Sequence, residues 1–324
     1  MTGACVCQKW LSFALYCPIK KSLRSFFDGA FLFLLIKIKP GFNNDDHNND
    51  QVSVMNIFIT GASSGIGTAI VLAYAKKYHA SDVNFGLLGR DSVRLQALKQ
   101  QLTAQNHTAQ HQYQVYAVDV RDATAMHLAA QQYITAFGAP NIVIANAGVS
   151  RGTLTELQDD VKAFQAIFDI NVMGMVHTFQ PFITVMKQAA KQGKLAQLIG
   201  IASVAGIRGL PGSGAYSASK SAVITYCESL RAEMQHYNIA VSTIAPGYIR
   251  TPMTALNHYA MPFLMDADVF ATKLIKAVDR KTRYQVIPWQ MGVVARIMRF
   301  IPACLWDRLM KSAPHKKRID WDWL

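Results

Sequence analysis

From residue 55 onward, short apolar runs alternate with longer stretches of helical periodicity, and this alternation constrains the fold more than any other feature. The runs that predict strands are 56–60, 83–88, 113–118, 142–145, 195–202, 239–245 and 284–287. The predicted helices are 66–78, 92–105, 123–137, 159–191 with a kink or boundary at Pro181, 215–237 and 266–279. The strands are apolar almost throughout, as in sheets that helices cover on both faces. The sequence therefore predicts an α/β fold built on a doubly wound parallel sheet, in a single domain.

The loop after the first strand is rich in glycine and leads directly into a helix. It reads Thr60-Gly61-Ala62-Ser63-Ser64-Gly65-Ile66-Gly67. Gly61 permits a tight turn, Gly65 lets the backbone approach a diphosphate, and Gly67 lets the helix pack closely on the sheet. The helix N-terminus offers free N–H groups and a positive dipole end to phosphates. This spacing, between a strand and a helix, predicts a dinucleotide site.

The end of the second strand indicates which dinucleotide is bound. NAD-binding chains commonly place an acidic residue here to accept the ribose hydroxyls, whereas this chain has Gly89 followed by Arg90. A cation at this point suits a 2′-phosphate, so we expect NADP in preference to NAD. The neighbouring Asp91 weakens that argument.

A second group of residues has the composition of an acid–base site. Tyr216 and Lys220 are four residues apart in a predicted helix, so both side chains rise from one face. Ser203 follows a strand, and a glycine-rich loop can bring it beside Tyr216. A tyrosine with a pKa near 10 is a poor acid or base at neutral pH, but a neighbouring ammonium and an oxidised nicotinamide favour the phenolate. Ser203 can hold a substrate oxygen by a hydrogen bond.

In this order, the motifs of residues 55–290 resemble the short-chain dehydrogenase/reductase family in its single-domain, Rossmann-like form. The resemblance implies catalytic roles for Ser203, Tyr216, Lys220 and Asn171, the last holding Lys220 through a water molecule. Tyr216 and Lys220 would also contact the cofactor. The other cofactor-binding residues implied are Thr60, Gly61, Ser63, Ser64, Gly65, Ile66, Gly67, Arg90, Asp119, Val120, Asn146, Ala147, Gly148, Pro246, Gly247, Ile249 and Thr251. Ala145 stands where the family carries an additional asparagine, at a position thought mainly structural.

Residues 1–54 differ from the rest and are expected to lie outside the core. A short apolar run at 30–36 and the polar stretch 43–50 suit a signal or anchor, a flexible extension, or sequence upstream of the true start at Met55. We favour the third, which the intact mass of the native protein would test.

The five cysteines show no metal spacing and indicate unpaired thiols in a reducing, cytoplasmic compartment. No metal site is expected, because His107 and His111 lack acidic or thiol companions and are interpreted as solvent-facing.

The C-terminal tail, residues 291–324, is amphipathic and basic. The formal net charge is +13, and residues 280–324 carry ten Lys and Arg against three Asp. This concentration favours an anionic membrane surface or a partner over nucleic acid, for which no recognition motif is present. A helix pair docked on its own core or on a second subunit is the equal alternative.

We also expect a homo-oligomer. The apolar residues between Tyr248 and Met265 suit an apolar or lipid-like substrate.

Two functions remain at this point. The first is an NADP-dependent oxidoreductase that interconverts a carbonyl compound, a ketone or aldehyde, and an alcohol. The second is a non-catalytic NAD(P)-binding sensor or scaffold on the same fold. A sensor would be expected to lose Tyr216 or Lys220, and both are present.

Overall fold

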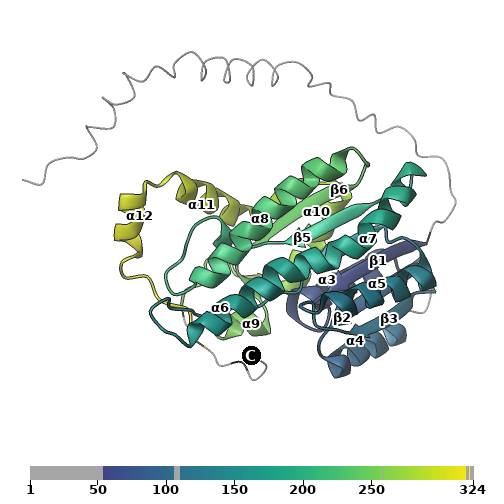
Figure 1. The fold of residues 1–324 in the computed structure, drawn as a ribbon, viewed down its shortest axis with the longest axis horizontal. Helices are drawn as coiled ribbons and strands as arrows, with labels where there is room; N and C mark the ends of the chain where they lie inside the picture. The colour runs from purple at the N-terminus through teal and green to yellow at the C-terminus, as the bar shows by residue number, and fades with distance from the viewer. Residues whose placement is uncertain (1–53, 106–109, 258, 319–320, 322–324) are drawn as a thin grey trace, which may run out of the picture. The chain divides into compact units, whose positions relative to one another are not determined.

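A seven-stranded parallel sheet forms the centre of the domain (Figure 1). The structure is a computed structural model that describes residues 54–105, 110–257, 259–318 and 321. The strands follow the order β3-β2-β1-β4-β5-β6-β9. Their bounds are β1 Met55–Thr60, β2 Val83–Gly89, β3 Gln112–Ala117, β4 Ile142–Ala145, β5 Gln197–Ile201, β6 Ala240–Pro246 and β9 Tyr284–Ile287. This is the predicted doubly wound parallel sheet.

Helices cover both faces of the sheet, which explains why its strands are apolar on both sides. Buried side chains of α3 (Gly65–Lys77), α4 (Ser92–Gln105) and α10 (Ala267–Asp279) pack in one core layer. Those of α5 (Ala123–Phe137), α7 (Gly174–Lys191) and α8 (Gly214–Gln235) pack in the other. Phe58 of β1 and Phe182 of α7 show the packing of the second layer, with ring centroids 4.7 Å apart.

The long predicted helix over 159–191 is interrupted earlier than expected. It consists of α6 (Asp160–Phe168), a π-helical turn at Asp169–Met173 and α7, while Pro181 lies inside α7. Of the two alternatives predicted for Pro181, the boundary is therefore wrong, and the kink stays a prediction. A proline costs a helix one backbone hydrogen bond, and the buried apolar face of α7 continues through it. The π turn matters for the site because it carries Asn171.

Two smaller elements were not predicted. Ile249–Arg250 (β7) and Met265–Asp266 (β8) form a two-stranded sheet, and Pro252–Ala255 forms the short helix α9. His111 also differs from expectation. Its ring lies 3.1 Å from the carbonyl oxygens of Tyr78 and Ser81, so it ties two loops together instead of facing solvent.

The C-terminal tail docks on its own domain. Helix α11 (Trp289–Phe300) buries Met291 and Ala295, whereas α12 (Ala303–Met310) buries none of its side chains. The predictions for residues 1–53 and for His107 lie outside the described residues. Where the chain is described, no helix is long and apolar enough to cross a membrane.

Candidate active site

The site lies where the strand order reverses, at the carboxyl ends of β1 and β4. Ligands bind at such switch points in open α/β sheets. Two adjoining clefts open here, of about 190 and 120 Å³. Both are lined by Gly61, Ser64, Ala147 and Gly148, so one extended ligand can occupy them together.

The two clefts gather most of the residues that the sequence analysis selected. The larger cleft is further lined by Gly65, Ile66, Asn146, Ser203, Tyr216, Lys220, Pro246, Gly247, Ile249 and Thr251. The smaller is further lined by Ser63, Arg90, Asp119 and Val120. The remaining predicted residues line neither cleft; they are Thr60, Gly67 and Asn171. The Thr60 hydroxyl accepts hydrogen bonds from the N–H groups of Asn146 and Ala147, which joins the ends of β1 and β4.

The glycine loop has the close backbone packing that a diphosphate site requires. Gly61 and Gly65 adopt left-handed conformations, with φ of +69° and +56°. A Cβ on Gly67 would lie 1.9 Å from the carbonyl oxygen of Gly61, so no other residue fits there without displacement. Ser64 is extended and precedes the first turn of α3. The loop therefore fits a dinucleotide, with its backbone N–H groups available to phosphate oxygens.

The smaller cleft holds a cluster of charges. Asp119 accepts hydrogen bonds from the backbone and side chain of Arg121, and its carboxylate lies 3.9 Å from the guanidinium of Arg90. Burial alone would raise the pKa of Asp119, but Arg121 and then Arg90 hold it below its ordinary value. Asp119 thus lies between two guanidinium groups, of which that of Arg90 lines the cleft.

Tyr216, Lys220 and Ser203 meet in the larger cleft. Tyr216 and Lys220 come from consecutive turns of α8, and the ammonium lies 5.9 Å from the centre of the tyrosine ring. Lys220 donates a hydrogen bond of 2.9 Å to the carbonyl oxygen of Ile201, at the end of β5. Ser203 follows that strand, and its hydroxyl accepts a hydrogen bond from the N–H of Ala205. Strand β5 thus positions both partners of Tyr216.

Burial controls the ionisation of this group. It raises the pKa of Tyr216 above its ordinary value, and a hydrogen bond with Ser203 partly opposes the effect. Burial lowers the pKa of Lys220 to about 8, partly opposed by the charge of Cys227. At neutral pH the phenol is therefore protonated and Lys220 is largely charged. The predicted lowering of the tyrosine pKa by Lys220 is therefore wrong for this structure, because burial raises that pKa. The lowering expected from an oxidised nicotinamide stays a prediction.

Asn171 connects the loop after β4 to α8, and its expected water-mediated contact with Lys220 stays a prediction. Its side chain exchanges hydrogen bonds with the backbone of Val149, at 2.8 and 3.0 Å, and donates to the Ser219 hydroxyl at 3.0 Å. It therefore pins the loop after β4 to α8. A Cβ on Gly148 would lie 3.2 Å from Asn171 Oδ1 and 3.4 Å from Lys220 Nζ, so glycine keeps the space between these two side chains open.

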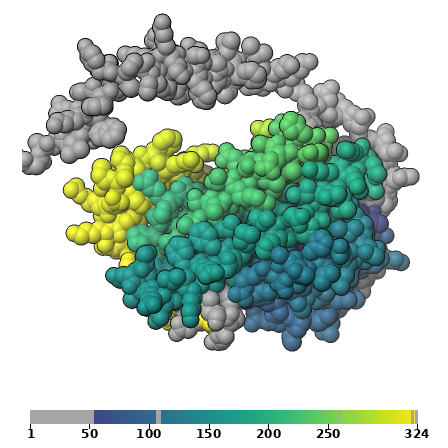
Figure 2. Space-filling view, in the orientation of Figure 1, coloured from purple at the N-terminus to yellow at the C-terminus, as the bar shows by residue number. Residues whose placement is uncertain are grey.

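Sequence reasoning missed one part of the site, which the end of the chain supplies. The tail returns past α12 to the loop before α6 (Figure 1), and in Figure 2 it lies against the teal and green surface of the preceding segments. Lys316 Nζ lies 5.6 Å from the centre of the Tyr216 ring. The basic run at 314–318 was interpreted as a membrane or partner surface, because nothing local in it shows a contact with residue 216.

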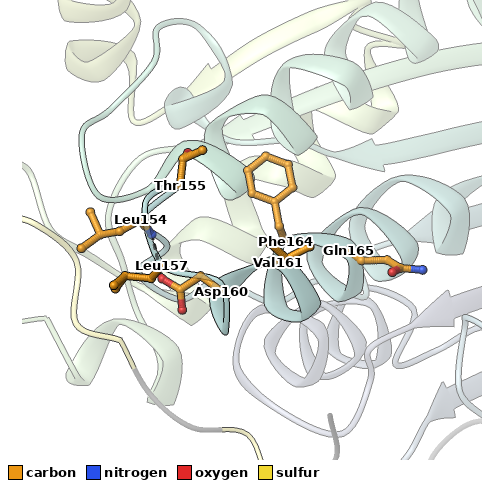
Figure 3. A pocket seen from close by; sticks show the side chains of 7 residues that line it. All are labelled: Leu154, Thr155, Leu157, Asp160, Val161, Phe164 and Gln165. Carbon is orange, nitrogen blue, oxygen red and sulfur yellow. Dashed lines mark hydrogen bonds between the residues drawn. The ribbon is translucent and has the colours of Figure 1, made fainter.

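A separate hollow of about 320 Å³ lies beside α6 (Figure 3). Its lining is mostly apolar and includes Leu154, Leu157 and Phe164, together with one carboxylate, Asp160. It shares no lining residue with the two clefts. It is therefore not part of the acid–base site.

Comparison with known proteins identifies the family. The family described as short chain dehydrogenase matches residues 55–260. The chain belongs to this family. An uncharacterized oxidoreductase of Myxococcus xanthus is 32% identical over 257 residues, which cover 79% of this chain and 96% of that protein. The mouse dehydrogenase/reductase SDR family member 7B is 30% identical over 275 residues, which cover 81% and 82% of the two chains. This short-chain dehydrogenase is thus an oxidoreductase by family.

Solved structures show the same fold. A 3-ketoacyl-(acyl-carrier-protein) reductase of Brucella melitensis, complexed with NADH, aligns with a TM-score of 0.64 at 20% identity, covering 73% of this chain and 97% of that one. A short-chain dehydrogenase of Sphingobium yanoikuyae, in complex with NADPH, aligns with a TM-score of 0.61 at 21% identity, covering 84% and 100%. The fold predicted from the sequence is therefore confirmed.

Proposed function

We propose that this short-chain dehydrogenase interconverts a carbonyl compound and an alcohol with NADP, using Tyr216 as the acid–base group. One observation carries the proposal. Ser203, Tyr216 and Lys220 line the same cleft as the glycine loop, so a reacting carbonyl and a dinucleotide can meet there. The glycine loop, the charged smaller cleft and the segment from Pro246 to Thr251 would hold the cofactor, which supplies or accepts the hydride when bound.

Each residue has a distinct task in the proposed reduction. The Ser203 hydroxyl donates a hydrogen bond to the carbonyl oxygen and fixes its position. Tyr216 gives its phenolic proton to that oxygen, as a general acid. The Lys220 ammonium stabilises the phenolate that remains, because opposite charges at short range favour ionisation. Asn171 acts as a positioning residue that keeps the loop after β4 against α8.

The choice of NADP rests on Arg90. The side chain lines the smaller cleft, where its guanidinium could form a charge-assisted hydrogen bond with a 2′-phosphate. Arg90→Ala should therefore raise the KM for NADPH by about tenfold or more, because the loss of one charge-assisted hydrogen bond lowers affinity by about that factor. The KM for NADH should not change. Equal loss with both cofactors, or a wild-type preference for NADH, would refute the assignment.

The substrate is proposed to have an apolar part. Ile249 and Met253 line the larger cleft beside Tyr216. Of the apolar residues between Tyr248 and Met265, Leu256 and Phe263 are about half exposed and so are available to an apolar substrate. The decisive assay follows oxidation of NADPH with short- and long-chain ketones. Turnover would support the enzyme, whereas tight NADPH binding without any turnover would favour the sensor.

We also propose a cytoplasmic protein that contacts membranes at their surface. Beyond the buried Met291 and Ala295, helix α11 exposes Ile297 and Phe300, the latter at 84%. Basic residues accompany them, which suits an anionic bilayer. Flotation with vesicles of phosphatidylserine and phosphatidylcholine tests this idea. The double substitution Ile297→Ser and Phe300→Ser should abolish binding, and unchanged flotation would refute the contact. The expected homo-oligomer is tested by sedimentation equilibrium.

A further inference from the structure

Residues 313–318, which we call the strap, lie between two loops of the active site. The N–H of Gly152 donates a hydrogen bond of 2.9 Å to the carbonyl oxygen of Lys317. A Cβ on Gly152 would lie 2.0 Å from the carbonyl oxygen of Lys316, and one on Gly212 would lie 2.6 Å from His315 Cβ. Glycine at both positions lets the strap lie directly on the loop before α6 and on the loop that leads to Tyr216 in α8.

A buried ion cluster anchors the strap. Asp160 is 2% exposed and binds two guanidinium groups, that of Arg318 through both carboxylate oxygens and that of Arg151 at 3.0 Å. It also accepts a hydrogen bond from the N–H of Leu154. Burial alone would raise the pKa of Asp160, but Arg318 and Arg151 hold it below its ordinary value. The carboxylate therefore stays charged and holds the strap in place.

Lys316 extends from the anchored strap toward Tyr216, although it lines neither cleft. Its ammonium donates a hydrogen bond of 2.7 Å to the Ser150 hydroxyl, four residues after Asn146 of the cleft wall. It lies 5.6 Å from the centre of the Tyr216 ring, about as close as the catalytic Lys220 at 5.9 Å. The tyrosine thus has two ammonium groups nearby, and only that of Lys220 is explained by the acid–base chemistry.

The charge of Lys316 has no acidic partner within the described part of the chain. Asp160, the carboxylate of α6 that anchors the strap, already binds two arginines. Burial lowers the pKa of Lys316 to about 8, so the ammonium persists at neutral pH at a cost in free energy. An anion brought by a ligand would remove that cost.

We propose that Lys316 and Ser150 form an anion-binding subsite beside Tyr216, which selects a carbonyl substrate carrying a carboxylate or phosphate close to the reacting carbon. This inference rests on the proposed function and narrows its substrate to an amphiphile, with the apolar part toward Ile249 and Met253. Lys316 is thereby a specificity residue supplied by the end of the chain. Its ammonium gives the anion a charge-assisted hydrogen bond, and the Ser150 hydroxyl gives a second donor.

The test compares four ketones of equal medium chain length. They are a 2-oxo acid, its methyl ester, a neutral 2-ketone, and the 1-phosphate of the corresponding 1-hydroxy-2-ketone. With NADPH, wild-type protein should turn over the 2-oxo acid or the phosphate with a kcat/KM about tenfold or more above that of its neutral partner. Comparing the 2-oxo acid with the ketone phosphate shows which anion the subsite prefers. Equal values for charged and neutral ketones would overturn the proposal.

Variants separate a binding role from a structural one. Lys316→Gln should remove the preference by raising KM for the anionic ketones alone, and Lys316→Arg should restore most of it. Lys311→Gln, the same charge change on an exposed residue of the tail, should keep the preference. A preference unchanged in Lys316→Gln would refute the subsite. A loss of turnover on the neutral ketones as well would indicate a structural role and also refute it.

A binding measurement keeps this inference distinct from the proposed function. If no ketone oxidises NADPH, the oxidoreductase proposal fails. Calorimetric titration of the NADPH-bound protein with the 2-oxo acid and with the ketone phosphate then tests the subsite by itself. Binding of either anion that Lys316→Gln abolishes would support the subsite. Absence of binding by both, or binding equal in wild type and variant, would refute it.

Discussion

The ion cluster under the strap makes the most quantitative prediction. Asp160→Asn keeps the shape of the side chain and removes its charge. Arg151, whose side chain is 5% exposed, then loses its buried partner, and Arg318 loses a bond to both carboxylate oxygens. Breaking a buried ion pair by removing one partner typically costs about 3–5 kcal/mol. We expect the free energy of unfolding to fall by about that amount.

Arg318→Gln should behave differently, although it breaks the same cluster. Its side chain is 40% exposed, so solvent screens the pair, and Asp160 keeps its buried partner Arg151. The expected cost is about 1 kcal/mol or less. Since this bond anchors the strap, the variant should nevertheless be cleaved faster by trypsin after Lys316 and Lys317.

Urea unfolding followed by circular dichroism measures both changes. Asp159→Asn is the matched control, because that carboxylate is exposed and makes no helix-capping bond, and it should change stability by about 0.5 kcal/mol at most. The depressed pKa of Asp160 adds a pH signature. The ionised Asp160 contributes fully to the free energy of unfolding above its unfolded pKa of about 4, and this contribution is lost as the pH falls further. The free energy of unfolding should therefore depend less on pH in this acidic range in Asp160→Asn than in the wild type. A cost below about 1 kcal/mol for Asp160→Asn would refute the account of a buried ionic anchor.

Two further predictions concern the glycine loop and the acid–base pair. Gly67→Ala places a Cβ 1.9 Å from the carbonyl oxygen of Gly61 and should weaken NADPH binding, measured by fluorescence titration, by about tenfold or more. Gly209→Ala, where a Cβ meets nothing within 4 Å, should bind NADPH normally, and equal affinities in both variants would contradict the reasoning. The kcat/KM for ketone reduction should fall as pH rises through about 8, because Lys220 then loses its proton. A profile of unchanged shape in Lys220→Met would show that another group titrates.

The sequence was sufficient where the signals are local. Strand and helix periodicity located the sheet, and the bounds of β4 and α5 match the prediction. The glycine loop, Tyr216 and Lys220 were found because fixed spacings on one element determine their geometry. The boundary placed at Pro181 failed because a buried apolar face carries α7 through the proline, while the π turn at Asn171 has no comparable signal.

The remainder depends on contacts between distant segments. Lys316 and Ser150 are 166 residues apart, and Asp160 and Arg318 are 158 apart. No periodicity connects such pairs, so the basic run at 314–318 was interpreted as a surface for a membrane or a partner. Gly152 and Gly212 leave room for the strap to cross their loops. Glycine in a loop has many uses, however, so these two residues alone do not predict the contact.

The central claim is that Tyr216 transfers the proton in this short-chain dehydrogenase. Single-turnover reduction of one ketone by NADPH, followed by stopped-flow absorbance in wild-type protein and in Tyr216→Phe, tests it most directly. The variant loses the phenolic hydroxyl alone, so its affinity for NADPH should remain within about threefold, less than a typical hydrogen bond is worth. The rate of hydride transfer should fall by about 10²–10⁴-fold. A rate within tenfold of wild type would contradict the account.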